Sequence, residues 1–444
     1  MSERASHPPE TWGPVRRAAA AIAAPIQRIL AVEAASGIIL LAATVAALVW
    51  ANVWTASYDE LWHLPIGGRI GPWTVERPLH FWVNDGLMTV FFLVVGLEIR
   101  REIFEGELAS LRKAALPVAA ALGGMLVPAI LCAALNAGRD GAAGWAVPMA
   151  TDIAFAVGIL TLLGARIPPA LRVLLLALAV IDDIGAIIVI SLFYSTGIAI
   201  EGIALVGVGI AMVLTFRAAG VRAPLLYVAP GIVVWMGLLV SGIHPTIGGV
   251  ILGLLTPARR WFGPSGFAET MQAQLERLPA DDRSALLSSL DRMNEARQEA
   301  VSPVERLIHA LHPWVAFVVM PVFALANAGV ILGGAQLAGD SLWLFLGIVA
   351  GLALGKPLGI ASFALAASKL GVAARAEDVT RRGVLLVGLV GGIGFTMALF
   401  IAQLAFPPGP LLDAAKLAIL VGSGAAMVIG LGFGLVCSAP ARGA

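Results

Sequence analysis

Runs of about twenty apolar residues, separated by shorter polar segments, recur along most of this 444-residue sequence. A helix of that length crosses the hydrocarbon core of a bilayer, which is roughly 30 Å thick. Apolar residues make up 59% of the chain and charged residues only 13%, whereas a soluble domain has roughly 45–50% and about 25%. The sequence therefore predicts an all-α membrane protein, and it contains no basic stripe that would indicate nucleic-acid binding.

The apolar runs predict twelve transmembrane helices. Their approximate spans are residues 34–52, 82–99, 114–135, 144–164, 171–194, 200–216, 224–241, 243–256, 313–332, 341–368, 384–405 and 413–436. Most of the 29 Lys and Arg residues fall in alternate loops, which the positive-inside rule assigns to the cytoplasm. The basic residues that this assignment leaves outside are Arg69, Arg77, Arg139 and Lys416. Both termini are then expected to be cytoplasmic, and one further basic residue, Lys356, lies inside a span.

The external stretch 61–79 is expected to form a small β-hairpin. It has short apolar arms on either side of Gly67 and Gly68, a pattern typical of two strands joined by a turn. The chain as a whole is predicted to divide into a cytoplasmic N-terminal segment, a twelve-span domain and a cytoplasmic tail, at residues 1–33, 34–436 and 437–444.

The longest cytoplasmic loop is expected at residues 257–312, which are polar and helical in pattern. Near its end, Ser302 is followed three residues later by Glu305, which is the spacing of a capping box. Pro303 stands at the first helical position, where a missing amide hydrogen costs little. A helix leading into the next span is therefore predicted to begin there.

Two adjacent carboxylates, Asp182 and Asp183, lie at the centre of the span 171–194. A charge at that depth costs roughly 2.5–3.5 kcal/mol on insertion scales. Neighbouring residues on a helix point about 100° apart, so the two side chains face different partners or a shared cavity. A structural pair satisfied by a neighbouring helix is the alternative, but Leu would serve structure without that cost. We therefore expect both acids to be functional.

Three other spans carry unusual groups at matching depth. Thr151 and Asp152 follow Pro148, whose ring removes a backbone donor, so that helix is expected to be interrupted there. Lys356 precedes a proline halfway across its own span and needs a carboxylate partner. Glycines, which weaken helices, cluster in a third span and predict a second interruption, at Gly388, Gly391, Gly392 and Gly394.

The order of these spans predicts an inverted repeat. The third to fifth and the tenth to twelfth spans form two trios of opposite direction, each with its broken helix in the middle. Broken, crossing helices with ionisable groups at the midplane point to the binding site of a secondary transporter. The alternative, glycines for helix packing and an aspartate for capping, explains each residue alone but not their shared depth.

Several long stretches resemble the NhaA-type bacterial sodium/proton antiporters. The similarity covers nearly the whole chain and includes "NDGLMTVFFLVVGLEIRRE", "MATDIAFAVGIL", "LALAVIDDIGAIIVI", "LHPWVAFVVMPVFALANAGV" and "GGIGFTMALFI". That family is itself a known example of the inverted-repeat architecture. The resemblance implies that Asp183 is the ion-binding acid, with Thr151 and Asp152 beside it. It also implies that Asp182 and Lys356 form a pair.

The resemblance further implies a function. The protein would extrude Na⁺, and Li⁺, from the cytoplasm in exchange for external H⁺, with both ions competing for the same carboxylates. Two protons for each sodium would make the cycle electrogenic. The family also implies a bacterial inner-membrane location, a role in pH and sodium homeostasis, a homodimer formed through the hairpin, and neither a cofactor nor an enzymatic reaction.

A second group of residues falls where the family responds to pH. It lies at the inner end of the second span and before the ninth, at Glu98, Arg101, Glu102, His309 and His312. The family commonly has an acid immediately before the first of those histidines, whereas this chain has Ile308. An ordinary solvated interface is the alternative interpretation of this group.

Two other classes of membrane protein remain as alternatives. A sodium- or proton-coupled symporter of a small solute could share the broken-helix fold, but it would need further polar groups for its solute. An intramembrane aspartyl protease also uses paired aspartates, in a Gly-x-Gly-Asp stretch. The aspartates here stand in "MATD" and "VIDD", which argues against a protease.

Overall fold

The computed structural model describes residues 33–70, 73–195, 197, 199–221, 223–259, 264–276, 288–294, 296, 300–333, 337–373 and 378–437. Most of the two expected terminal segments lies outside these residues. Within them the chain is mainly helical, with one two-stranded sheet. The helical membrane protein that the sequence predicts agrees with this architecture.

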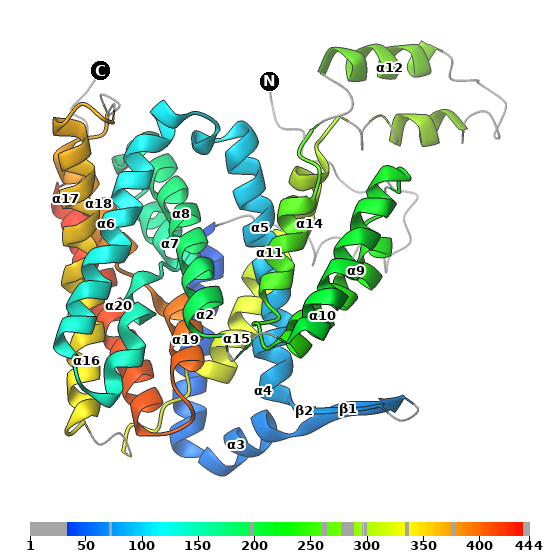
Figure 1. Ribbon diagram of the computed structural model, residues 1–444. Helices are drawn as coiled ribbons and strands as arrows, with labels where there is room; N and C mark the ends of the chain where they lie inside the picture. The colour runs from blue at the N-terminus through cyan, green and yellow to red at the C-terminus, as the bar shows by residue number, and fades with distance from the viewer. Residues whose placement is uncertain are drawn as a thin grey trace, which may run out of the picture.

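The long helices stand side by side in a bundle (Figure 1). In chain order the helices of the bundle and its loops are α2 (Glu33–Val53), α5 (Met88–Glu105), α6 (Leu111–Leu135), α7 (Ile153–Leu163), α8 (Pro169–Phe193), α9 (Ile200–Ala218), α10 (Val228–Ser241), α11 (Ile247–Leu255), α12 (Pro264–Glu276), α14 (Pro303–Trp314), α15 (Met320–Asn327), α16 (Asp340–Ala350), α17 (Lys356–Lys369), α18 (Arg381–Gly391), α19 (Phe395–Ala405) and α20 (Pro410–Cys437).

Shorter helical segments complete the chain. Besides α3 (Thr55–His63) and α4 (Leu79–Phe81), there are 3-10 segments η2 (Glu107–Ala109), η3 (Asp140–Met149), η4 (Gly164–Arg166) and η5 (Pro224–Tyr227). Three π-helical turns, η1 (Trp82–Leu87), η6 (Val315–Val319) and η7 (Gly351–Gly355), connect α4 to α5, α14 to α15 and α16 to α17. Each of these connected pairs forms one long helix of membrane-spanning length.

The described residues contain nine helices that are long and apolar enough to cross a membrane. Two bent helix pairs raise this number to eleven if each pair is one span. The remaining expected span, 243–256, is the eighth in chain order and corresponds to α11, which has nine residues. Such a helix is only about 14 Å long, much less than the roughly 30 Å core. The described part of the chain therefore supports up to eleven of the twelve expected spans.

The chain around α11 explains why this helix is short. It begins only after Pro245, and it ends at Leu255, because Thr256 precedes Pro257 and has an extended backbone with ψ of 134°. A residue before proline is disfavoured in the α region. The helix instead packs closely along α5, where a Cβ atom on Gly249 would lie 2.3 Å from the Thr89 carbonyl oxygen.

The expected hairpin is present, but its turn is not where the sequence analysis placed it. Strands β1 (Pro65–Ile70) and β2 (Trp73–Pro78) pair antiparallel. Gly67 and Gly68 lie within β1, opposite Glu76 and Val75, so the prediction of a turn at this glycine pair is wrong. Strand β1 continues to Ile70 and β2 begins at Trp73, and the two residues between them lie outside the described residues.

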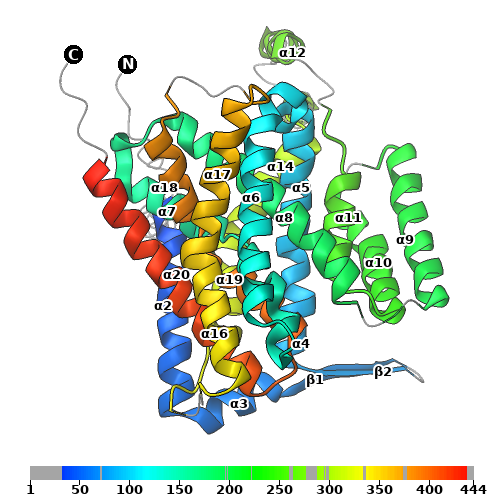
Figure 2. The same ribbon diagram turned by 60° about the vertical axis from the view of Figure 1, so that its left-hand side comes forward.

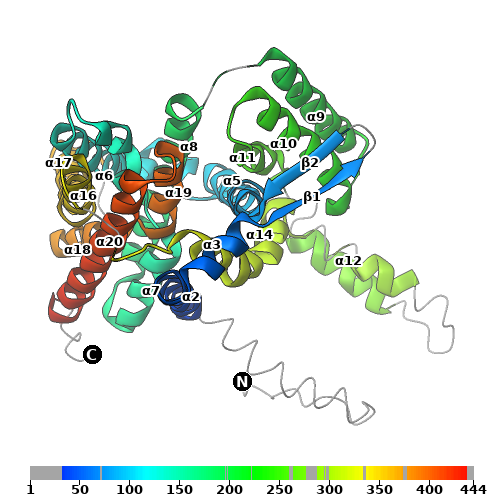
Figure 3. The same cartoon turned by 90° about the horizontal axis from the view of Figure 1, so that it is seen from below.

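The bundle has two sides, with α5 between them. Figures 2 and 3 show α9, α10 and α11 together on one side, and α16, α17, α18 and α20 on the other. The hairpin leaves the bundle at one end, and α12, from the loop 257–312, lies at the opposite end (Figure 1). The predicted capping box is confirmed, since Ser302 accepts from the Glu305 amide where α14 begins.

Close antiparallel packing of α6 against α16 and α17 brings the midplane groups together. A Cβ atom on Gly123 would lie 2.1 Å from the Gly359 carbonyl oxygen, so the two backbones touch. Further along α6, Pro128 meets Gly355, and Asn136 donates to the Trp343 carbonyl over 3.4 Å. Along α6 the residue numbers rise from 123 to 136, whereas those of the residues that they contact on α16 and α17 fall from 359 to 343. The first helix of one trio, α6, therefore runs opposite to the first helix of the other, as an inverted repeat requires.

Candidate functional site

Two interrupted helices meet at the centre of the bundle. The η3–α7 pair bends by 43° and the α18–α19 pair by 47°, each at a short break. At these breaks the Asp152 amide donates to the Ile393 carbonyl over 2.7 Å, and the Thr151 hydroxyl donates to the Gly391 carbonyl over 3.3 Å. Hydrogen bonds therefore hold one break against the other, at the two positions where the sequence predicts interruptions.

The sequence around each break explains why the helices stop. Pro148 lies two residues before the first break, in a 3-10 segment rather than in the expected α-helix. At the second break glycine allows close backbone contact. A Cβ atom on Gly392 would lie 2.5 Å from the Leu352 carbonyl oxygen, and one on Gly394 would lie 2.9 Å from the Ala150 carbonyl oxygen. A larger residue at Gly394 would push the two breaks apart, and one at Gly392 would push the second break away from η7.

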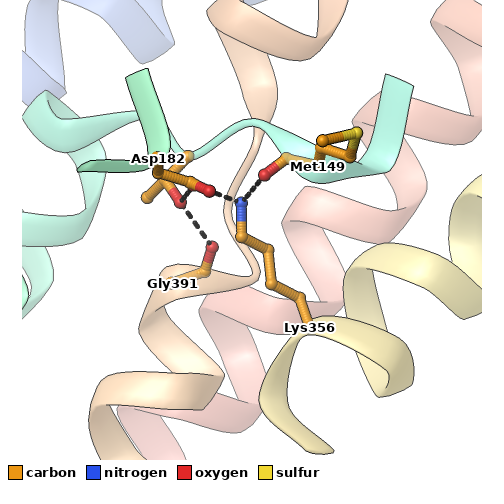
Figure 4. A network of polar contacts seen from close by, with 5 residues as sticks. Met149, Asp182, Lys356 and Gly391 are labelled. Carbon is orange, nitrogen blue, oxygen red and sulfur yellow. Dashed lines mark hydrogen bonds and ion pairs between the residues drawn. The ribbon is translucent and has the colours of Figure 1, made fainter. Parts of the chain in front are cut away.

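Lys356 and Asp182 form an ion pair beside these breaks (Figure 4). The Lys356 Nζ atom lies 2.8 Å from Asp182 Oδ2 and also donates to the Met149 carbonyl at the end of η3. The Thr151 hydroxyl donates to the same Oδ2 atom over 2.5 Å. The structure thus brings together the two residues that the sequence analysis paired, and it adds Thr151 as a third member.

Asp152 serves the N-termini of two helices. It is the N-cap of α7, where its Oδ1 atom accepts from the Phe155 amide over 3.2 Å. Its Oδ2 atom accepts from the Thr396 amide over 3.2 Å and from the Thr396 hydroxyl. A negative charge is favourable at helix N-termini, which carry partial positive charge. Asp152 therefore neutralises both of the helix ends that start at the breaks.

Asp183 is buried and differs from the other midplane groups. Within the described part of the chain, its Oδ1 atom has no hydrogen-bond partner, and the same holds for Oδ1 of Asp182. The family resemblance implies that Thr151 and Asp152 lie beside Asp183. In this structure the Thr151 hydroxyl donates to Asp182, and Asp152 caps two helices. The charged groups that act on Asp183 are Asp182, Glu98, Lys356 and Asp152.

The residues at the C-terminal end of α5 that are expected to respond to pH, Glu98, Arg101 and Glu102, differ in their contacts. The neighbouring residues Val95 and Ile99 pack against α8, so this part of α5 faces the helix that carries Asp183. Glu102 accepts from the Glu107 amide over 2.9 Å at the start of η2. The pair of Arg101 and Glu102 is long, at 4.0 Å. Glu98 lies between Val95 and Ile99 in sequence, on this part of α5.

The histidines on α14 lie on its exposed side. His309 and His312 are both exposed. Ile308, in contrast, is buried with Leu97 of α5 and Val304. An acid at this position would have to enter an apolar contact between α14 and α5. The departure from the family pattern at Ile308 therefore agrees with the packing of this chain.

Sequence reasoning missed Thr396 and Ser423. Ser423 of α20 accepts from the Phe395 amide over 3.1 Å, next to the Thr396–Asp152 contacts. Both side chains are buried. Thr396 stands two residues after Gly394, and Ser423 stands between two glycines in "VGSGAA". Each residue is a hydroxyl side chain close to glycines in an apolar segment, and this feature of the sequence could have identified both.

Comparisons with known proteins give a consistent result. A family profile described as Na⁺/H⁺ antiporter 1 matches residues 27–433. A Na⁺/H⁺ antiporter NhaA 2 of Sorangium cellulosum is 56% identical over 448 residues, covering 99% of this chain and 96% of the relative. The protein of the same name from Myxococcus xanthus is 54% identical, with 96% and 92% covered. A Na⁺/H⁺ antiporter NhaA of Bartonella tribocorum is 47% identical, with 93% and 92% covered.

Proposed function

Because the chain belongs to the Na⁺/H⁺ antiporter 1 family, we propose that it extrudes Na⁺, and Li⁺, from the cytoplasm in exchange for external H⁺ at the carboxylates between its two broken helices. As a member of this family it is a multi-pass membrane transporter and not an enzyme. One observation carries the proposal. Asp183 has a buried carboxylate oxygen without a described partner, directly beside the Asp182–Lys356 pair.

Asp183 is the acid that binds the transported ion. Sodium is a hard cation and prefers oxygen ligands, as calcium and magnesium do. Oδ1 of Asp183 and Oδ1 of Asp182 are two buried oxygens that no described donor satisfies. Thr151 and Asp152 supply further oxygens nearby when their present hydrogen bonds open. Buried carboxylate oxygens without donors are costly, so a cation or a proton that binds them is favoured.

Competition for these oxygens couples the two ions. A carboxylate that holds Na⁺ must be deprotonated, and a proton on the same oxygen removes the ligand. The neighbouring acids titrate as a group, so protons leave in steps that belong to the cluster. Since sodium and protons exclude each other at one site, each crossing of the membrane carries one or the other. Exchange then follows without any further coupling device.

The Lys356–Asp182 pair acts as the switch. It is fully buried, so removing the charge from either partner leaves the other uncompensated. Lys356 also holds the Met149 carbonyl, and Thr151 connects Asp182 to the Gly391 carbonyl. Opening the pair therefore loosens a contact at each break, and the bundle can change the side to which the site is open.

The exchange is electrogenic if two protons enter for each sodium that leaves. One net charge then moves inward per cycle, worth about 2.3 kcal/mol per 100 mV. The membrane potential would drive sodium out against its gradient. The proposal places the protein in a bacterial inner membrane with both termini in the cytoplasm, where it contributes to pH and sodium homeostasis.

Two further features belong to the same proposal. Within the described residues no third strand covers either edge of the hairpin β1–β2, and the hairpin would join two protomers in a homodimer. Glu98, together with Arg101, Glu102, His309 and His312 at the cytoplasmic side, would adjust activity to pH. Ile308 cannot contribute a charge to this adjustment.

Reconstitution into liposomes tests the proposed function. Vesicles that hold the purified protein and a trapped pH dye would be given a Na⁺ gradient, with K⁺ as the control ion. We expect Na⁺ and Li⁺ to move protons and K⁺ to have no effect. An inside-negative or inside-positive potential, set with valinomycin, should change the rate. Proton movement that requires an organic solute would instead support a symporter.

A further inference from the structure

Thr396, the second residue of α19, contacts one oxygen of Asp152 in two ways. Its backbone amide donates to Oδ2 over 3.2 Å, and its hydroxyl donates to the same atom. Thr396 is 0% exposed and Asp152 is 1% exposed, so water does not compete for these bonds. The amide contact is what a capping acid provides. The hydroxyl contact is not needed for capping, and it occupies an oxygen that a cation would use.

Ser423 of α20 supplies the other cap of the same helix. The first turn of a helix leaves four amides without partners inside the helix. In α19, Phe395 donates to the neutral Ser423 hydroxyl over 3.1 Å, and Thr396 donates to the Asp152 carboxylate. Acceptors from two different elements thus bind the first two amides of α19. Because Ser423 accepts from the Phe395 amide, Asp152 accepts from only one of these two amides.

Both oxygens of Asp152 are therefore occupied. Oδ1 accepts from the Phe155 amide of α7, and Oδ2 has the two contacts from Thr396. A cation that binds Oδ2 of Asp152 has to displace the hydroxyl of Thr396, because the amide of Thr396 is held by its helix and Oδ2 already accepts two hydrogen bonds. A hydrogen bond to an ionised group is roughly twice as strong as a neutral one. The threonine hydroxyl is thus an effective competitor of the ion.

We propose that Thr396 and Ser423 are positioning residues that set how far Asp152 is available to the transported cation. The Thr396 hydroxyl withholds Oδ2, whereas Ser423 keeps the carboxylate from being drawn further onto the end of α19. This inference rests on the proposed exchange of Na⁺ for H⁺. It adds that α20, through Ser423, belongs to the ion site.

The sharpest variant is Thr396→Val, which keeps the shape and the backbone amide but removes the hydroxyl. We expect the apparent KM for Na⁺ to fall about tenfold, as for loss of one hydrogen bond to a charged group. A more tightly held ion also leaves more slowly, so kcat should fall as well and kcat/KM should change much less. Thr396→Ser keeps the hydroxyl and should restore both constants.

Thr44→Val is the matched control. Thr44 is a buried threonine of α2 whose hydroxyl donates to the Leu40 carbonyl of its own helix over 2.8 Å, and not to a residue of the ion site. Removing this hydroxyl should leave KM for Na⁺ unchanged. Ser423→Ala should act in the opposite direction to Thr396→Val, since the Phe395 amide loses its acceptor and pulls on Asp152. Its KM for Na⁺ should rise.

All four variants would be measured in liposomes beside the wild type, at one pH and with matched protein content by gel filtration. A Thr396→Val variant with the same KM as Thr44→Val would overturn the inference, as would a Thr396→Ser variant that behaves like Thr396→Val. A fall in KM for Ser423→Ala would contradict the role of the serine. If the wild type itself moves no protons with Na⁺, the proposed function fails instead.

Discussion

The Nζ atom of Lys356 lies 2.8 Å from Oδ2 of Asp182, with 0% and 1% of the two side chains exposed. Only one carboxylate oxygen takes part, because Oδ1 of Asp182 has no partner in the described part of the chain. The pair is therefore held through one oxygen, which also accepts from Thr151. Lys356 and the Thr151 hydroxyl therefore both depend on the charge of Asp182.

The first prediction concerns the loss of the lysine. Lys356→Ala leaves Asp182 buried without its counter-charge, and breaking a buried pair in this way costs about 3–5 kcal/mol. We expect a lower melting temperature in detergent, measured by tryptophan fluorescence. A second change, Asp182→Asn, removes the stranded charge and should restore part of the loss. A double variant no more stable than Lys356→Ala would show that the two residues are not energetic partners.

The second prediction concerns a buried amide cluster at the C-terminal end of α15. Asn327 donates to Asn84 Oδ1 and to the Phe323 carbonyl, each over 2.8 Å, and its Oδ1 atom contacts His80 and Gln403. Asn327→Leu leaves these polar groups without a partner, at a cost of about 1–3 kcal/mol. The melting temperature should fall accordingly.

A double variant distinguishes the loss of hydrogen bonds in this cluster from a general loss of packing. If the amides act as one network, Asn327→Leu combined with Gln403→Leu should cost less than the sum of the two single changes. Strictly additive losses would mean that the hydrogen bonds between Asn327 and Gln403 contribute nothing of their own. The same melting measurement serves for all three proteins.

The third prediction concerns pH and His244. His244 lies in the turn before α11, and its Nε2 atom is 3.0 Å from the carbonyl oxygen of Tyr194 at the end of α8. Burial lowers the pKa of His244 below its usual 6.5, although the bond to Tyr194 opposes this. The unfolded chain then binds more protons than the folded one, so the free energy of unfolding decreases as pH falls through 6.5, down to the folded pKa.

His244→Gln removes this titration. Between about pH 7.5 and 5, the melting temperature of the wild type should fall more steeply than that of the variant. Equal slopes for both proteins would refute the assignment. Because His244 lies outside the helices that are long enough to span a membrane, transport itself is not the readout.

The fourth prediction concerns the hairpin. Replacing residues 65–78, which include both strands, by a short Gly-Ser linker removes two sheet edges that could pair with a second protomer. Crosslinking in membranes should detect a dimer for the wild type and mainly monomer for the variant. Transport by each protomer should persist. Failure to crosslink the intact protein would contradict the proposed dimer.

The central features of the fold and site could be predicted because a charged residue or a helix break inside a membrane carries a high free-energy cost. A charge or a helix break in an apolar run is expensive, so Asp182, Asp183, Lys356 and the two breaks stand out in the sequence. Their pairing followed from the need of a buried lysine for a carboxylate. The family resemblance placed the same residues, and the structure brings Asp182 and Lys356 into contact.

Features that depend on tertiary packing could not be predicted in the same way. Thr396 and Ser423 are ordinary in an apolar helix, and only the packing of α19 against α7 and α20 gives them their partners. The short length of α11 depends on prolines at both ends, whereas its hydropathy alone suggests a span. The turn of the hairpin was misplaced because glycines also occur inside paired strands.

Na⁺ binding to Asp183→Asn tests the central claim most directly, because this change removes the charge of the unpartnered acid and leaves the Asp182–Lys356 pair in place. Binding would be followed in purified protein by calorimetry and by the protons that Na⁺ releases, with Asp152→Asn as the comparison. We predict no Na⁺ binding and no proton release for Asp183→Asn, and weakened but measurable binding for Asp152→Asn. Near-normal Na⁺ binding and proton release by a correctly folded Asp183→Asn protein would contradict the account.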